Sequence, residues 1–130
     1  MQYLLLLYDD PAQYAQGEEL ERVIGEHKAF SRNLVEEGKY LHSNALEPAA
    51  TATTVRIRNG KTMTLDGPFA ETREQLGGYY LVEARDLDEA IAMAGRLPNA
   101  RSGSVEIRPI NIAVRADFER EGIIPKDIKP

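Results

Sequence analysis

The sequence predicts an α+β fold, a ferredoxin-like sandwich in which an antiparallel sheet carries two helices on one face. The predicted elements follow the chain as strand, helix, strand, hairpin, strand, helix, strand, which reads as two strand–helix–strand halves. With 130 residues, 42% of them hydrophobic and 28% charged, the chain has the size and balance of one globular domain with its own core.

The first strand and helix follow from the hydrophobic pattern. Residues 2–8 form an apolar run that stops at Asp9, Asp10 and Pro11, which is typical of a strand buried on both faces. Helical spacing then runs from Glu18 to Glu37. Its apolar stripe includes one histidine and consists of Leu20, Val23, Ile24, His27, Phe30 and Leu34.

The pair Asn59–Gly60 predicts a tight β-hairpin after a strand at residues 39–46. A two-residue turn places Arg58 opposite Lys61, and like charges in that position favour a face that points into solvent.

The second half repeats the pattern of the first. Residues 77–84 predict a strand, and Asp86 with Glu89 forms a capping-box-like start for a helix that ends before Pro98. Residues 104–110 alternate as the last strand. The domain is therefore expected at residues 1–110. Residues 111–130 form a C-terminal extension with a short helix in 114–122, packed on the domain or on a dimer partner.

Composition narrows the function classes. The net charge of −5 disfavours nucleic acid and anionic membranes as partners, and the absence of cysteine excludes disulfides and thiolate chemistry. The apolar start lacks the basic region of a signal peptide and is too short to span a bilayer, so we expect a cytoplasmic protein. Two distant histidines with scattered carboxylates give no metal-ligand spacing, and we expect no metal or other cofactor.

The two histidines are the candidate acid–base groups. His27 lies on the helical stripe, and His42 lies in a strand beside Ser43 and Asn44. A catalytic histidine needs a partner that orients its ring, and Asp66 is the candidate by its chemistry. A histidine on an apolar helix face is also commonly a core residue, and the sequence leaves both interpretations open.

The stretch from Leu65 to Tyr80, LDGPFAETREQLGGYY, has the composition of a turn or of a site wall. Asp-Gly-Pro is ordinary turn chemistry, and Phe69 is expected to plug the core. The glycine pair at a strand start predicts a bulge or a close approach of backbone. The residues proposed to bind a substrate are Arg73, Gly77, Gly78 and Tyr79.

This stretch, continued through VEARDLDEAIAMAGRLP and GSVEIRPI, resembles the DGPF-containing branch of the YCII-related domain family. MQYLLLLYDD and HKAF match it as well. The resemblance implies a dimeric α+β barrel, in which two sheets pack face to face around a two-fold axis. It also implies a cleft between helix and sheet with a His–Asp pair, here His27 and Asp66.

Three functions follow from the sequence and the resemblance. The first is a small cofactor-free enzyme that uses His27 and Asp66 for proton transfer or elimination on a small organic substrate. The second is a homodimer that binds a small molecule in the cleft without catalysis, for which a regulatory system with an extracytoplasmic-function sigma factor is the candidate context. The third is a structural dimer without a ligand.

Overall fold

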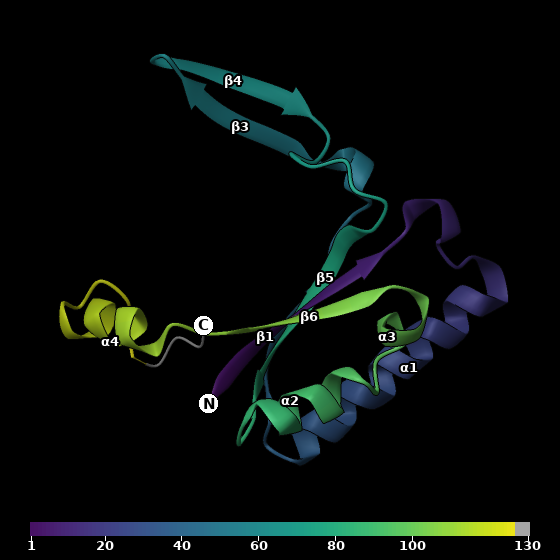
Figure 1. Cartoon of the computed structure of the whole chain (residues 1–130). Helices are drawn as coiled ribbons and strands as arrows, with labels where there is room; N and C mark the ends of the chain where they lie inside the picture. The colour runs from purple at the N-terminus through teal and green to yellow at the C-terminus, as the bar shows by residue number, and fades with distance from the viewer. Residues whose placement is uncertain (127–130) are drawn as a thin grey trace.

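A four-stranded antiparallel sheet forms the centre of the protein, which a computed structural model describes over residues 1–126 (Figure 1). Its strand order is β2-β5-β1-β6, so β1 and β5 lie in the middle. The strands are β1 (Gln2–Asp9), β2 (Tyr40–Ala45), β5 (Gln75–Glu83) and β6 (Ser104–Pro109). The helices are α1 (Gly17–Glu36), α2 (Leu87–Ala94), α3 (Asn99–Ser102) and α4 (Ile112–Arg120). Short 3-10 turns lie at Pro11–Gln13 and Ala49–Thr51.

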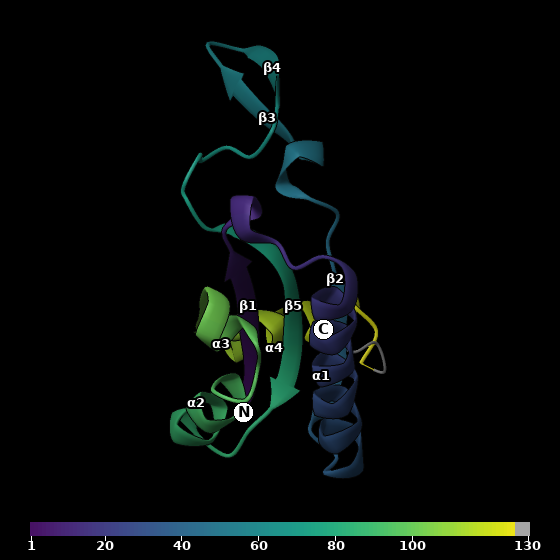
Figure 2. The ribbon, with the colours of Figure 1, turned by 90° about the vertical axis from the view of Figure 1, so that its right-hand side faces the viewer.

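Helices α1, α2 and α3 cover one face of the sheet, and α4 lies on the other side (Figures 1 and 2). The core between sheet and helices is apolar and continuous, and burial of this surface is the main favourable term in folding. It includes Leu5, Leu7, Phe30, Leu34, Tyr80, Val82, Ala90, Met93 and Leu97. The predicted arrangement of two main helices on one face is confirmed.

Strand β1 alternates between a buried and a half-buried side. Tyr3, Leu5 and Leu7 are buried under the helices, whereas Leu4 and Leu6 are only partly covered. The prediction that this strand is buried on both faces was therefore wrong for the single chain. The side chains of a strand point alternately to opposite faces, and the described helices cover one of these faces fully. We call the other one the open face.

The predicted hairpin is present, but it does not join the main sheet. Strands β3 (Thr53–Arg58) and β4 (Lys61–Asp66) form a two-stranded sheet of their own that projects away from the domain (Figure 1). Arg58 lies opposite Lys61, as predicted, and both are exposed. Phe69, which follows the hairpin, is 75% exposed, so the prediction that it plugs the core was wrong.

The ends of the helices follow local chemistry. Gly38 has a φ of +71° just after α1, which suits a residue without Cβ at a helix C-terminus. Asp86 caps α2, since its Oδ1 accepts from the Glu89 backbone N–H at 2.9 Å. The Glu89 side chain accepts from the Arg85 N–H at 3.1 Å, one residue before the position that a capping box uses.

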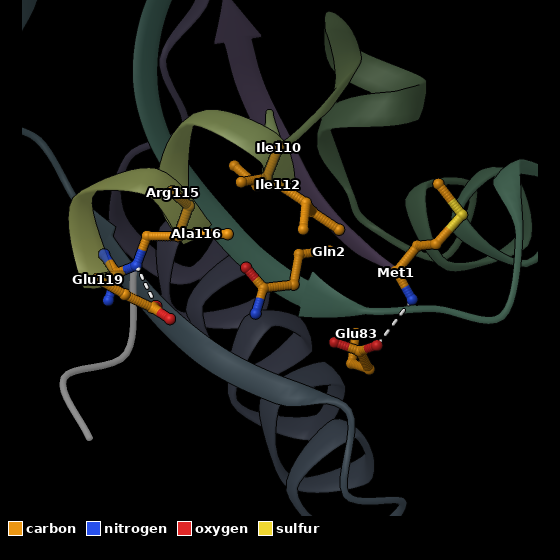
Figure 3. Close-up of a pocket in the computed structure, with 8 residues that line it drawn as sticks. All are labelled: Met1, Gln2, Glu83, Ile110, Ile112, Arg115, Ala116 and Glu119. Atoms are coloured by element: carbon orange, nitrogen blue, oxygen red, sulfur yellow. Dashed lines mark hydrogen bonds and ion pairs between the residues drawn. The ribbon is translucent and has the colours of Figure 1, made fainter. Parts of the chain in front are cut away.

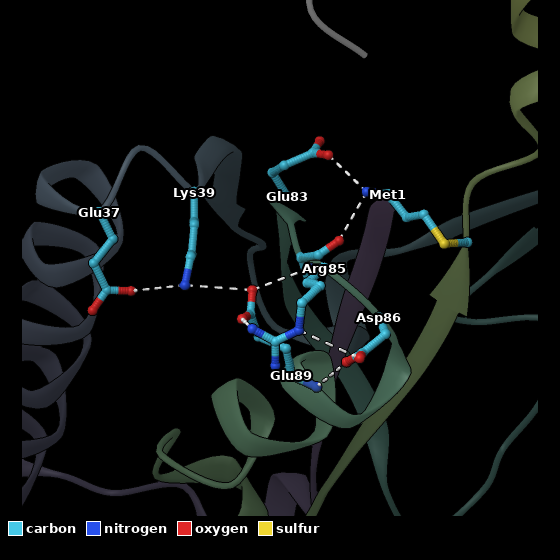
Figure 4. Close-up of polar contacts among 8 residues, drawn as sticks. Met1, Glu37, Lys39, Glu83, Arg85, Asp86 and Glu89 are labelled. Carbon is cyan, nitrogen blue, oxygen red and sulfur yellow. Dashed lines mark hydrogen bonds and ion pairs between the residues drawn. The ribbon is translucent and has the colours of Figure 1, made fainter.

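A chain of ion pairs links this α2 start to the end of α1 (Figure 4). Lys39 lies 3.6 Å from Glu37 and 3.4 Å from Glu89, and Arg85 lies 3.1 Å from Glu89. These groups are partly exposed, so each pair contributes little stability by itself. They fix the positions of the two helix ends relative to each other.

The segment after β6 contains the predicted short helix, α4, whose N-cap Asn111 accepts from the Val114 N–H at 3.0 Å. The last residues of the predicted 111–130 extension, 127–130, lie outside the described part of the chain. Across residues 1–126, no helix combines the length and the apolar character that a membrane crossing requires.

Gly103 marks a close approach of backbone between the loop after α3 and the end of β1. A Cβ at this position would lie 2.0 Å from the Tyr8 carbonyl oxygen and 2.7 Å from Asp9 Oδ1. Only a residue without a side chain therefore allows α3 to dock here.

We predict that Gly103→Ala destabilises the protein by about 1–3 kcal/mol, because backbone must move to admit the methyl group. Gly25→Ala is the matched control, since a Cβ there meets no atom within 4 Å. It should stabilise α1 by about 0.5–1 kcal/mol. Urea unfolding of both variants measures the difference, and equal stabilities would contradict the proposed docking constraint.

Candidate acid–base site around His27

His27 projects from the middle of α1 onto the sheet, where it meets Tyr80 of β5. The His27 Nδ1 atom lies 2.8 Å from Tyr80 Oη, and the two rings are stacked with centroids 5.9 Å apart. Tyr80 is buried, and Phe30 packs edge-on against it at 5.0 Å. The packing of Tyr80 therefore fixes the orientation of the half-buried imidazole ring.

Burial sets the protonation states of this pair. Desolvation lowers the pKa of His27, and the carboxylates of Glu26 and Asp9 act in the opposite direction with smaller effect. Desolvation also raises the pKa of Tyr80. His27 is therefore neutral and Tyr80 protonated at neutral pH. The proton between them can be carried by either atom, since a neutral imidazole nitrogen can donate or accept.

Asp9 ends β1 beside this pair and is held by α3. Its Oδ2 accepts from Asn99 Nδ2 at 2.6 Å, and its Oδ1 accepts from Ser102 Oγ at 2.6 Å. Both carboxylate oxygens are thus fixed by one short helix. Charge-assisted hydrogen bonds of this kind are stronger than neutral ones, so the negative charge has a defined position near His27.

Asn99 is the one polar or charged residue among residues 1–126 that is buried, with 8% exposure. Its side chain also interacts with His27 and raises the pKa of the ring. The contact does not reach hydrogen-bond geometry, because within residues 1–126 Asn99 Oδ1 has no hydrogen-bond partner. A buried acceptor without a partner is costly, and here it lies beside the imidazole of His27.

The predicted partner of His27, Asp66, lies in the β3–β4 hairpin. It ends β4, pairs with Thr53 across the hairpin and is exposed. In the described residues His27 bonds to Tyr80, and the carboxylates that act on its pKa are Glu26 and Asp9. The His27–Asp66 pair stays a prediction, and Glu26 and Asp9 are the carboxylates that raise the pKa of His27.

Arg73 lies in the loop before β5 and reaches the same end of the sheet as Asp9. Its Nε atom pairs with Asp10 Oδ2 at 3.2 Å, and its side chain is 80% exposed. This contact joins residues that are 63 positions apart in the chain. The backbone N–H of Ala12 and then Arg73 lower the pKa of Asp10.

The glycine pair at the start of β5 has the predicted effect on the backbone. The register between β1 and β5 shifts at Leu7 and Tyr8, where Gly77 is the extra residue of the bulge. A Cβ on Gly78 would lie 3.0 Å from the Asn44 carbonyl oxygen, so the backbones approach closely. These contacts describe backbone packing, and they do not identify the N–H group of either glycine as a donor to a substrate.

Tyr79 belongs to a second polar cluster on the open face. Its hydroxyl lies 2.8 Å from His42 Nδ1 and accepts from Asn44 Nδ2 at 3.1 Å. The His42 and Tyr79 rings stack with centroids 5.8 Å apart. Because Tyr79 and Tyr80 point to opposite faces, the sheet separates this cluster from His27.

Four residues of the His27 site were missed by sequence reasoning, and one of them is Tyr80, its hydrogen-bond partner. In the sequence, Asp9 was interpreted only as the residue that ends a strand, although a carboxylate at the end of a buried strand is well placed to line a site. Asn99 and Ser102 lie in a helix of four residues. Such a helix is too short to show a period in sequence.

A cavity of about 330 Å³ lies on the other side of the protein, between α4 and the start of β1 (Figure 3). Its walls include Met1, Gln2, Glu83, Ile110, Ile112 and Glu119. It shares no residue with the His27 site. Within residues 1–126, no three His, Cys, Asp or Glu side chains gather closely enough to bind a metal ion.

Comparison with known proteins assigns the chain to a family. The model of the YCII-related domain matches residues 1–113, so the chain belongs to the YCII-related domain family. It is 43% identical over 114 residues to an uncharacterised protein of Rhizobium meliloti (strain 1021), covering 85% of this chain and 92% of that protein.

Among solved structures, one similar chain is 5-chloro-2-hydroxyhydroquinone dehydrochlorinase from Burkholderia phenoliruptrix AC1100, in complex with 2,5-dihydroxybenzoquinone. The sequence identity is 14% and the TM-score 0.44, with 85% of this chain and 94% of that chain covered. At this distance the likeness carries no argument about activity.

We predict that His27 titrates below about 6.5, the ordinary value for histidine, in an NMR titration of its ring protons. Asp9→Asn should lower this pKa further, because the carboxylate favours the charged ring. Asp88→Asn, which alters an exposed carboxylate at the start of α2, is the matched control and should leave it unchanged. A shift caused by Asp66→Asn alone would bring Asp66, rather than Asp9, into the site.

The same pKa predicts how stability depends on pH. Because the pKa of His27 is lower in the folded state, the unfolded chain binds the proton first as the pH falls. The free energy of unfolding therefore decreases between about 6.5 and the folded-state pKa. His27→Gln should remove this part of the pH dependence, measured by urea unfolding at several pH values. An identical pH dependence in both proteins would contradict a depressed pKa.

Proposed function

We propose that this member of the YCII-related family is a small enzyme that transfers protons with His27 and needs no cofactor for that step. The observation that carries the proposal is the half-buried, neutral His27 fixed by Tyr80 at 2.8 Å beside the anchored carboxylate of Asp9. A histidine kept neutral at physiological pH is suited to accept a proton from a substrate.

The chemistry follows from the charges around the ring. His27 takes a proton from a carbon next to a carbonyl group or next to a leaving group. The imidazolium that forms is stabilised by Asp9 and Glu26, both of which favour the charged ring. Burial keeps the imidazole of His27 neutral before the reaction, and the two carboxylates stabilise its charged form. Both are needed in a group that must gain and then lose a proton.

Arg73 is the cation proposed to hold an anionic substrate. It lies at the Asp9–Asp10 end of β1 and its only ion pair within residues 1–126 is with Asp10. An exposed pair of this kind is weak, so a substrate carboxylate or enolate can replace Asp10. The participation of Asp66 remains a proposal that rests on the family resemblance, and that of Gly77, Gly78 and Tyr79 remains a proposal that rests on their place in β5.

We further propose that the protomer is a ferredoxin-like sandwich of the DGPF branch, acts in the cytoplasm and pairs through its open face. The strand order β2-β5-β1-β6 supports the sandwich. The half-buried side chains of Leu4, Leu6 and Tyr79 support a partner on that face. A second copy covers it, as the dimeric α+β barrel of the resemblance implies.

The second candidate function is a homodimer that binds a small molecule for regulation, with an extracytoplasmic-function sigma factor system as its candidate context. The cavity of about 330 Å³ near α4, away from His27, favours it because it offers space for a ligand without an acid–base group. In that case His27 and Tyr80 form a structural hydrogen bond in the core.

We predict that His27→Gln lowers kcat/KM about 10²–10⁴-fold on any substrate found by screening small aromatic acids and lactones, because it removes the proton acceptor. His42→Gln, on the opposite face, is the matched control and should retain activity. A thermal-shift screen of the same compounds separates binding from turnover. Compounds that stabilise wild type and His27→Gln equally, without turnover, would favour the regulatory function.

A further inference from the structure

The β3–β4 hairpin exposes an unusual amount of apolar surface for a segment that has no core of its own. Val55 and Ile57 are 61% and 63% exposed, and Met63 and Leu65 are each 45% exposed. A two-stranded hairpin alone is marginally stable in water. A well-formed hairpin of this composition therefore needs a surface to pack against, and the described part of its own chain supplies little.

The two sides of the hairpin differ in chemistry. Directly opposite residues share a side, so Val55 and Ile57 lie with Thr64 and Thr62 on a side without charge apart from Asp66 at its base. The other side carries Arg56, Arg58 and Lys61 beside Met63 and Leu65. The uncharged, mostly β-branched side is the one suited to burial.

The place of the hairpin points to what covers it. The hairpin and α4 both extend to the side of the sheet away from α1 and α2 (Figure 1). α4 adds exposed apolar residues of its own, Ile112, Val114 and Phe118. The half-buried open face lies between them. The hairpin and α4 therefore flank the face on which we propose the dimer.

Charge favours a second copy of this chain as the occupant. The chain carries a net charge of −5, so two copies repel each other. The hairpin is locally cationic, and the side chains of Arg56 and Lys61 have neither a hydrogen bond nor an ion pair within the described residues, 1–126. Cations brought to an acidic partner offset that repulsion.

We propose that the β3–β4 hairpin is a dimerisation arm. When the open faces of two copies meet, the Val55–Ile57 side of each arm packs on the partner, and its cations lie at the rim of the interface. The proposal rests on the dimer proposed above but not on the catalytic role of His27. It also explains why the hairpin is separate from the main sheet, since an arm must reach beyond its own protomer.

The test compares the double variant Val55→Thr, Ile57→Thr with wild type by sedimentation equilibrium. Threonine keeps the β-branched shape and removes apolar surface. The matched control is Val35→Thr, Ile91→Thr, which alters residues of similar exposure, 60% and 51%, on the helical side. Circular dichroism and thermal unfolding check that each variant is folded.

We expect the arm variant to weaken the dimer about tenfold or more, because four positions lose buried apolar surface, and the control to leave it unchanged. Hydrogen exchange provides a readout without mutation. The amides of residues 53–66 should be protected in the dimer and exchange faster on dilution to the monomer. If the arm variant dimerises with unchanged affinity and the hairpin amides are unprotected, the proposed role of the hairpin as an arm is overturned, but the proposed dimer is not.

A wild-type chain that is monomeric at every concentration overturns both the arm and the dimer. Neither result bears on proton transfer by His27, which the activity of His27→Gln decides separately. The two proposals can therefore fail independently.

Discussion

The alternation of side chains along β1 and β5 is the constraint on which the rest of the structure depends. These strands lie side by side in the middle of the sheet, so every residue in them is assigned to one of two faces. The face with Leu5 and Tyr80 is buried under α1 and α2, and the hydrophobic effect holds it there. The other face, with Leu4 and Tyr79, is left half-covered.

This alternation separates the two histidines. Each histidine stacks on a tyrosine and lies 2.8 Å from its hydroxyl, but His27 does so in the partly buried layer under α1 and His42 on the open face. Desolvation acts on the first pair, where it lowers the pKa of the imidazole and raises that of the phenol. Both histidines have a tyrosine partner, so it is burial that distinguishes His27, the candidate acid–base group, from His42 on the surface.

The polar groups near His27 also belong to the stability of the fold. Asp9 would be a poorly placed charge at the end of a core strand if Asn99 and Ser102 did not donate to both of its oxygens. Gly103 allows this docking because any side chain there would collide with the β1 backbone. The same contacts that close the fold at this end therefore hold a negative charge next to the imidazole.

Local chemistry determined much of this protein from sequence alone. Features that depend on residues a few positions apart could be predicted, and these were the strands, the α1 stripe, the Asn59–Gly60 hairpin and the Asp86 cap. Only the tertiary structure decided that Asp9 meets Asn99, 90 residues away in the chain, and that the hairpin leaves the sheet. Such contacts depend on how layers pack, and short-range patterns do not encode which distant residues share a face. The LDGPF motif drew attention to Asp66 in the sequence. In the structure, Asp9 of the first strand is a carboxylate that acts on the pKa of His27.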